Sequence, residues 1–101
     1  MTTPALPNFT PGVLTGDDVT ALFDAAKAGG FAIPAVNCTG SNTINGAMET
    51  AAALNSPVII QFSHGGGAFV GGKGIKLKGD AAAIAGSLAA AHHVNTLAAA
   101  Y

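Results

Sequence analysis

The chain has 101 residues, of which 50% are hydrophobic and only 9% are charged, and its net charge is −1. Because globular domains usually carry about 25% charged residues, much of this surface is expected to be covered by other parts of a larger architecture. The charge excludes nucleic-acid binding through a basic stripe, and the single cysteine, Cys38, excludes an intrachain disulfide and indicates a reducing compartment, the cytoplasm.

Residues 1–14 contain three prolines and no periodic pattern, which predicts an extended lead-in. The first residues lack a basic segment followed by an apolar core, so no secretory signal is expected there. Residues 81–100 are apolar enough to raise the question of a membrane span. Polar residues crowd the second half of that stretch and alanine is a weak membrane residue, so we expect no membrane helix and no membrane partner.

A first helix is predicted after Thr15, which we expect to be its N-cap. Asp17 and Asp18 lie in the first turn and Lys27 in the last, where each charge suits the helix dipole. Gly29 and Gly30 end the helix by allowing positive φ. The buried face is predicted to consist of Val19, Leu22, Phe23 and Ala26.

Two apolar runs follow, at residues 32–36 and 58–60. Strands that are apolar on both faces are typical of a parallel sheet covered by helices. The residues between them have one apolar stripe at helical spacing, formed by Ile44, Ala47, Met48, Ala51 and Leu54. The pattern therefore predicts an α/β fold with a right-handed strand, helix, strand unit.

Polar residues come at the exit of each predicted strand: Asn37 and Cys38 after the first, Ser63 and His64 after the second. Ligands bind at the carboxyl ends of parallel strands, so both groups point to one candidate site. Asn37 either contacts substrate or ties down the following turn. Ser63 is better suited to donate its hydroxyl than to act as a nucleophile, because no orienting base accompanies it. Cys38 is favoured as a small buried apolar residue.

Residues 64–79 are rich in glycine and lysine, which predicts a mobile loop that becomes ordered on ligand binding. Gly67 to Lys73 matches G-x-x-x-x-G-K, yet Gly74 replaces the serine or threonine of a phosphate loop and no helix begins at once. A nucleoside triphosphate site is therefore disfavoured. The alternative left open is that backbone N–H groups of the loop approach a phosphate.

Asp80 is predicted to cap a long last helix whose buried face includes Ile84 and Leu88. His92 continues that face and is expected to be a hydrogen-bonded core histidine. His92 and His93 point about 100° apart on a helix, so the histidines form no metal site among themselves. The chain ends at Tyr101 without a glycine cap or a following strand, and we expect that it is truncated there.

Four stretches resemble the amino-terminal part of class II fructose-bisphosphate aldolases: PGVLTGDDV, AIPAVNCTGSNTINGAMETAA, SPVIIQFSHGGGAFVGGKG and AHHV. The resemblance implies a (β/α)8 TIM barrel, of which residues 1–101 would be the amino-terminal part of a single domain: the first two βα units and the helix that precedes them. It further implies a cytoplasmic homodimer in glycolysis and gluconeogenesis. The implied reaction is the reversible, zinc-dependent cleavage of fructose 1,6-bisphosphate to dihydroxyacetone phosphate and glyceraldehyde 3-phosphate.

By motif, Ser63 is similar to the family's serine that contacts the glyceraldehyde 3-phosphate part of the substrate, and Asn37 to its substrate-contacting asparagine. The chain departs from the family at His64, where asparagine is usual. The resemblance places the zinc ligands and the acid/base aspartate beyond Tyr101, so it assigns no catalytic and no metal-binding residue to this segment. The 101 residues alone are therefore predicted to be inactive.

Three alternatives stay open on the sequence alone. The first is an aldolase of the same class acting on tagatose 1,6-bisphosphate, which would differ in the handling of one hydroxyl group. The second is a phosphate-binding strand, helix, strand module without enzymatic activity. The third is a structural fragment that assembles only with the remaining strands of a barrel.

Overall fold

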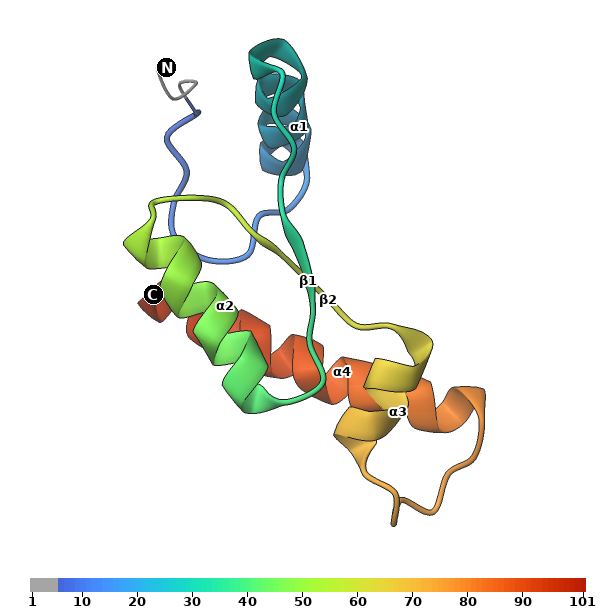
Figure 1. Cartoon of the computed structure of the whole chain (residues 1–101). Helices are drawn as coiled ribbons and strands as arrows, with labels where there is room; N and C mark the ends of the chain where they lie inside the picture. The colour runs from blue at the N-terminus through green and yellow to red at the C-terminus, as the bar shows by residue number, and fades with distance from the viewer. Residues whose placement is uncertain (1–5) are drawn as a thin grey trace.

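Two short parallel strands joined by a helix form the centre of the chain, and the remaining helices are arranged around them (Figure 1). The computed structural model describes residues 6–101. Its radius of gyration is 15.2 Å, against about 13 Å for a compact domain of this length, so the arrangement is open. The predicted α/β class is confirmed. The elements are α1 (Asp17–Gly29), β1 (Ala35–Asn37), α2 (Ser41–Ala53), β2 (Ile59–Gln61), α3 (His64–Gly71), α4 (Asp80–Leu97) and the 3-10 turn η1 (Ala98–Ala100).

β1 and β2 pair in parallel, with Ala35 opposite Ile59 and Asn37 opposite Gln61. The predicted direction is confirmed, but both strands lie later in the chain than expected. β1 begins only after Pro34, because proline has no N–H to donate to a strand ladder. The carbonyl of Pro34 still accepts a hydrogen bond of 2.8 Å from the N–H of Ile59.

The hydrophobic core lies on one face of this sheet, between β2, α2 and α4. Its centre consists of Cys38, Ile44, Met48 and Ala90, and Ile60 and Phe62 pack against it. Successive side chains of a strand point to opposite faces, and Ile59, the neighbour of Ile60, is 37% exposed. The expectation that helices cover both faces of the sheet is thus met on one face within this chain.

α1 begins after Gly16, not after a capping side chain. Gly16 adopts φ 58° and no side chain makes a cap hydrogen bond, so the prediction that Thr15 caps the helix is wrong. The predicted end is confirmed, because Gly30 has φ 67° and its N–H bonds back to the carbonyls of Ala26 and Lys27. The aspartates of the first turn and Lys27 in the last turn are placed as predicted.

The predicted loop over residues 64–79 is wrong for its first half, since His64–Gly71 form helix α3. Two features make a helix possible in so glycine-rich a sequence. Ser63 caps it, with its Oγ accepting a hydrogen bond of 3.0 Å from the N–H of Gly66. Gly67 lies directly against Gly86 of α4, so the helix is held by close backbone packing.

α4 buries a different face from the one predicted. Ile84 and Leu88 are 59% and 66% exposed, whereas the buried residues are all small: Ala82, Ala83, Gly86 and Ala90. The reason is the close approach of α3, which leaves no room for larger side chains on the contact face. Gly79, at φ 58°, is the N-cap, so Asp80 is the first residue of the helix and not its predicted cap.

Residues 6–14 form neither helix nor strand, in agreement with the predicted extended lead-in. Residues 1–5, which belong to the same predicted segment and to the start that was searched for a secretory signal, lie outside the described part of the chain. None of the helices that the structure describes combines the length and the apolarity needed to cross a membrane.

Candidate functional site

Asn37 and Ser63 meet at the carboxyl ends of the two strands. Asn37 is the last residue of β1, and Ser63 follows β2 as the N-cap of α3. The Oδ1 of Asn37 accepts a hydrogen bond of 2.9 Å from the backbone N–H of Ser63. The structure therefore brings the two residues together at one rim, as strand polarity predicted, and Asn37 ties the exit of one strand to the exit of the other.

The hydrogen bonds within this rim use acceptor atoms and leave donors free. The Oγ of Ser63 accepts from the N–H of Gly66, so its hydroxyl proton remains available. The Oδ1 of Asn37 is likewise occupied, while its amide NH2 makes no hydrogen bond within residues 6–101. Both residues are exposed. Such a rim suits a ligand group that only accepts hydrogen bonds, as an ionised phosphate does.

Cys38 follows Asn37 but points into the core. Its side chain is completely buried and its Sγ donates a long hydrogen bond of 3.6 Å to the carbonyl of Val36. Burial raises the pKa of the Cys38 thiol, and a hydrogen bond with Thr43 offsets this in part. The interpretation of Cys38 as a buried apolar residue is confirmed.

Cys38 is expected to react with a disulfide reagent at neutral pH at least about 100-fold more slowly in the folded chain than in urea, because its raised pKa and burial deplete the exposed thiolate. A thiol whose pKa is raised on folding stabilises the fold at low pH, and that contribution is lost as pH rises through the raised value. A spectrophotometric thiol assay measures the rates. Equal rates in buffer and in urea would contradict the buried position.

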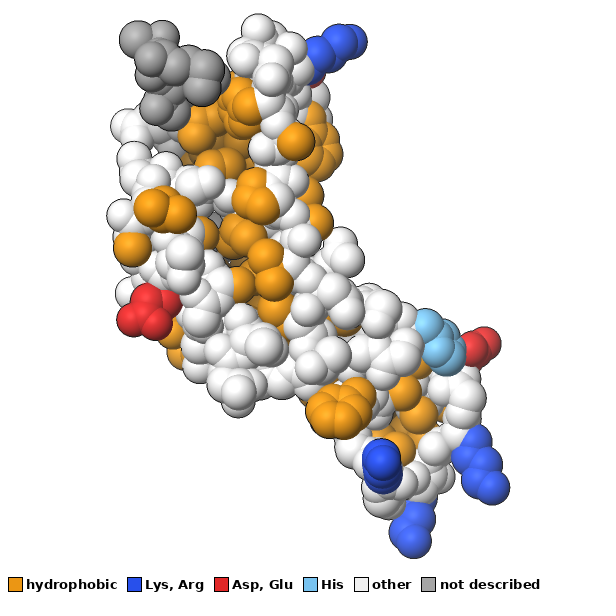
Figure 2. All heavy atoms as spheres, in the orientation of Figure 1, with side chains coloured by type: hydrophobic (Ala, Val, Ile, Leu, Met, Phe, Trp, Pro, Cys, Tyr) orange, Lys and Arg blue, Asp and Glu red, His pale blue; other side chains and the backbone are white. Residues whose placement is uncertain are grey.

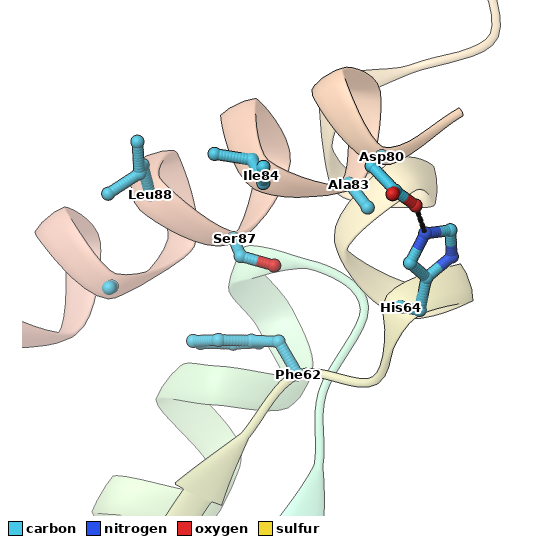
Figure 3. Close-up of a pocket in the computed structure, with 8 residues that line it drawn as sticks. Phe62, His64, Asp80, Ala83, Ile84, Ser87 and Leu88 are labelled. Carbon is cyan, nitrogen blue, oxygen red and sulfur yellow. Dashed lines mark hydrogen bonds and ion pairs between the residues drawn. The ribbon is translucent and has the colours of Figure 1, made fainter. Parts of the chain in front are cut away.

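An open groove of about 700 Å³ adjoins Ser63. Figure 3 shows one end of the groove, where the Nε2 of His64 lies 2.9 Å from the Oδ1 of Asp80, and Ser87 adds a hydroxyl group further along α4. Its remaining lining is apolar and includes Phe62, Ile84 and Leu88. No sequence pattern indicated that His64 and Asp80 would meet, since they are separated by the whole of α3 and the turn after it.

Gly67 to Lys73 do not form a phosphate loop, in agreement with the sequence analysis that disfavoured one. Such a loop precedes a helix whose N-terminus faces the phosphate, whereas here Gly67–Gly71 lie inside α3 and Lys73 follows its C-cap, Gly72. Lysine side chains surround the turn between α3 and α4 in Figure 2, and Lys73, Lys76 and Lys78 are all exposed.

Of the two neighbouring histidines of α4, it is His93 and not His92 that is partly buried. His92, predicted to be a core histidine, is exposed. His93 is half-buried instead, and its Nε2 lies 2.7 Å from the Oδ1 of Asn45 on α2. The prediction for His92 is wrong because the buried face of α4 is rotated away from the stripe of Ile84 and Leu88.

The donor side chains of this chain do not fit a zinc site. A zinc ion takes at least three protein ligands, and no group of three histidine, cysteine, aspartate or glutamate side chains comes together within the part of the chain that the structure describes. Residues 1–5 are Met-Thr-Thr-Pro-Ala and carry none of these donors. The pair of His64 and Asp80 offers only two.

Known proteins similar to this chain agree on one family. A family model described as fructose-bisphosphate aldolase class-II matches residues 17–100. The class 2 fructose-bisphosphate aldolase of Escherichia coli K12 is 53% identical over 89 residues, which cover 87% of this chain and 25% of that protein. The fructose-bisphosphate aldolase of Kluyveromyces lactis is 52% identical over 90 residues, 89% of this chain and 25% of that protein.

A solved structure is similar as well. The crystal structure of the fructose-bisphosphate aldolase of Campylobacter jejuni superposes with a TM-score of 0.81 at 47% identity, covering 90% of this chain and 25% of that one. The chain thus spans about a quarter of the length of the relatives it matches.

Proposed function

Because this chain belongs to the class-II fructose-bisphosphate aldolase family, we propose that it works as part of an aldolase that reversibly cleaves fructose 1,6-bisphosphate to dihydroxyacetone phosphate and glyceraldehyde 3-phosphate. In this proposal residues 1–101 are the amino-terminal part of one (β/α)8 barrel domain and contribute its first two βα units. The names of the similar aldolases support fructose rather than tagatose bisphosphate as the substrate.

The observation that carries the proposal is the rim of Asn37 and Ser63. Each side chain has its acceptor oxygen bonded within the protein and a donor left over. Two free donors at the ends of adjacent parallel strands fit the phosphate oxygens of a sugar bisphosphate. We assign Ser63 to the glyceraldehyde 3-phosphate part of the substrate and Asn37 to a second substrate contact beside it.

The assigned function also includes parts that this chain does not supply. We propose that the aldolase uses zinc, with ligands from segments outside these 101 residues, since the donors present here do not assemble into a metal site. This chain's own contribution is to bind and orient the substrate, and it contains no catalytic residue. The homodimer and the cytoplasmic location are proposed for the whole protein on the family resemblance.

Ser63 has two proposed roles, as the cap of α3 and as a contact to the substrate phosphate. Substitutions of Ser63 separate these roles and thereby test the rim. Ser63→Asp keeps the cap of α3 but places a carboxylate against the phosphate. In the aldolase that carries this chain, we expect it to raise KM for fructose 1,6-bisphosphate at least about 100-fold, since like charges at a binding site repel. Ser63→Thr keeps both the cap and the hydroxyl and serves as the matched control, with KM within about threefold of wild type.

Steady-state rates of cleavage, with circular dichroism to verify folding, give the comparison. Equal KM values for the Ser63→Asp and Ser63→Thr enzymes would show that Ser63 caps a helix and contacts no phosphate.

A further inference from the structure

His64 and Asp80 join the starting points of two helices. His64 is the first residue of α3 and Asp80 the first residue of α4. The Nε2 of His64 lies 2.9 Å from the Oδ1 of Asp80, within hydrogen-bond distance. This contact joins the two ends of the segment 64–80 to each other (Figure 3). It thereby connects the first turn of α3 to α4, next to the rim of Asn37 and Ser63.

The first turn of α3 also fixes the orientation of the Ser63 hydroxyl. The N–H of Gly66, in that turn, donates to the Oγ of Ser63, and the backbone N–H of Ser63 donates to Asn37. Further along α3, Gly67 is held against Gly86 of α4. One residue earlier, Gly66 lies against the loop after β1, where an added Cβ would come within 3.4 Å of Thr39 and 3.5 Å of the carbonyl oxygen of Cys38, whereas an added Cβ at Gly65 would meet nothing within 4 Å. These contacts hold the first turn of α3 on the side of β1, and the bond between His64 and Asp80 links its first residue to α4.

The pair contributes little to the overall fold. The side chains of His64 and Asp80 are 66% and 90% exposed, and ion pairs in water are weak because solvent screens them and both side chains lose rotamer entropy. A weak contact next to a binding group acts on geometry more than on stability. Small displacements of a positioned group reduce binding and rate far more than they reduce folding.

From these contacts, and resting on the proposed function, we propose that His64 and Asp80 form a positioning pair. By holding the first turn of α3 against α4, the pair keeps the Ser63 hydroxyl directed at the phosphate of the glyceraldehyde 3-phosphate half of the substrate. Neither residue touches the reacting atoms. Loss of the pair should therefore weaken recognition at one end of the substrate only.

The test measures KM separately for the two halves of the substrate in the aldolase that carries this chain. His64→Ala and Asp80→Ala should each raise KM for fructose 1,6-bisphosphate and for glyceraldehyde 3-phosphate by about three- to tenfold, while KM for dihydroxyacetone phosphate stays within about twofold. The double variant should be no worse than either single one, because both remove the same contact.

Conservative variants should restore the function. In His64→Gln the amide nitrogen can replace Nε2 as donor, and in Asp80→Asn the side-chain oxygen can still accept. Both are expected to have KM values close to wild type. His92→Ala, which removes an exposed histidine elsewhere on α4, is the control for loss of a histidine and should change neither KM value.

The outcomes separate this inference from the function on which it rests. If Ser63→Asp impairs the enzyme but His64→Ala and Asp80→Ala do not, the rim is right and the positioning pair is wrong. The pair is also wrong if both triose phosphates are affected alike, or if the two single effects add. If the wild-type protein does not cleave fructose 1,6-bisphosphate, the proposed function itself fails.

Discussion

Replacing Gly86 by alanine is expected to lower the free energy of unfolding of this chain by about 3 kcal/mol or more. A Cβ added at Gly86 would overlap the carbonyl oxygen of Gly67 and come within 2.7 Å of its carbonyl carbon and 2.9 Å of the backbone nitrogen of Gly71. All three are backbone atoms, so no side-chain rotation relieves the clash. α3 has to move away from α4, which opens the contact that holds the glycine-rich helix.

The sign of this effect is what makes it informative. In an exposed helix interior, replacing glycine by alanine usually stabilises by about 0.5–1 kcal/mol, because alanine loses less backbone entropy on folding. Gly46 of α2 offers that case in the same chain, as an added Cβ there would meet nothing within 4 Å. We therefore expect Gly46→Ala to raise and Gly86→Ala to lower the midpoint of urea unfolding, followed by far-ultraviolet circular dichroism. If the two variants were equally stable, α3 and α4 would not meet at Gly67 and Gly86.

The same contact explains why residues 64–71 were not predicted to be helical. Glycine has one of the lowest helix propensities, and His64–Gly71 contain four glycines. The helix is held by contacts that are distant in sequence, mainly the approach of Gly67 to Gly86. Single-residue propensity contains no information on such a partner, although the Ser63 cap could have been read as a start signal.

The direction of the strands and the meeting of Asn37 with Ser63 followed from the sequence, because apolar runs and strand polarity are local properties. The buried face of α4 did not. Ile84 and Leu88 lie at helical spacing, yet they are exposed and small residues pack instead. A hydrophobic stripe predicts which face of a helix is buried. Figure 2 shows several hydrophobic side chains on the surface of this chain, so hydrophobicity alone does not determine which residues are buried here.

The exposed apolar side chains support the expectation, drawn from composition, of a larger architecture. Within residues 6–101, ten large hydrophobic residues are exposed, among them Leu54 at 71% and Phe69 at 63%. In this described part of the chain, only one face of the two-stranded sheet packs on a core. Sheets of two strands are marginal in isolation, and further strands beside β1 and β2 would bury much of this surface, as the proposed barrel requires.

The 101-residue chain on its own is expected to have no measurable aldolase activity, whereas the proposed full-length aldolase is expected to be active. Cleavage of the bond between two carbons requires a group that stabilises the resulting carbanion and a group that moves the hydroxyl proton. The candidate site offers the donors of Asn37 and Ser63, and neither titrates near neutral pH. The titratable side chains of His64 and Asp80 lie beside the groove, where they are paired with each other.

A coupled assay that detects glyceraldehyde 3-phosphate, run on the purified chain with zinc added and with a chelator, measures this. The chain with Ser63→Asp is the matched control, since any cleavage that depends on the rim must fall in that variant while contaminating aldolase would not respond. Cleavage that the chelator abolishes and Ser63→Asp reduces would contradict the prediction, because it would mean that these residues assemble a complete site, for example between copies of the chain. Absence of cleavage, together with binding of fructose 1,6-bisphosphate that Ser63→Asp weakens, is the result expected of a segment that positions substrate and leaves the chemistry to the rest of the proposed barrel.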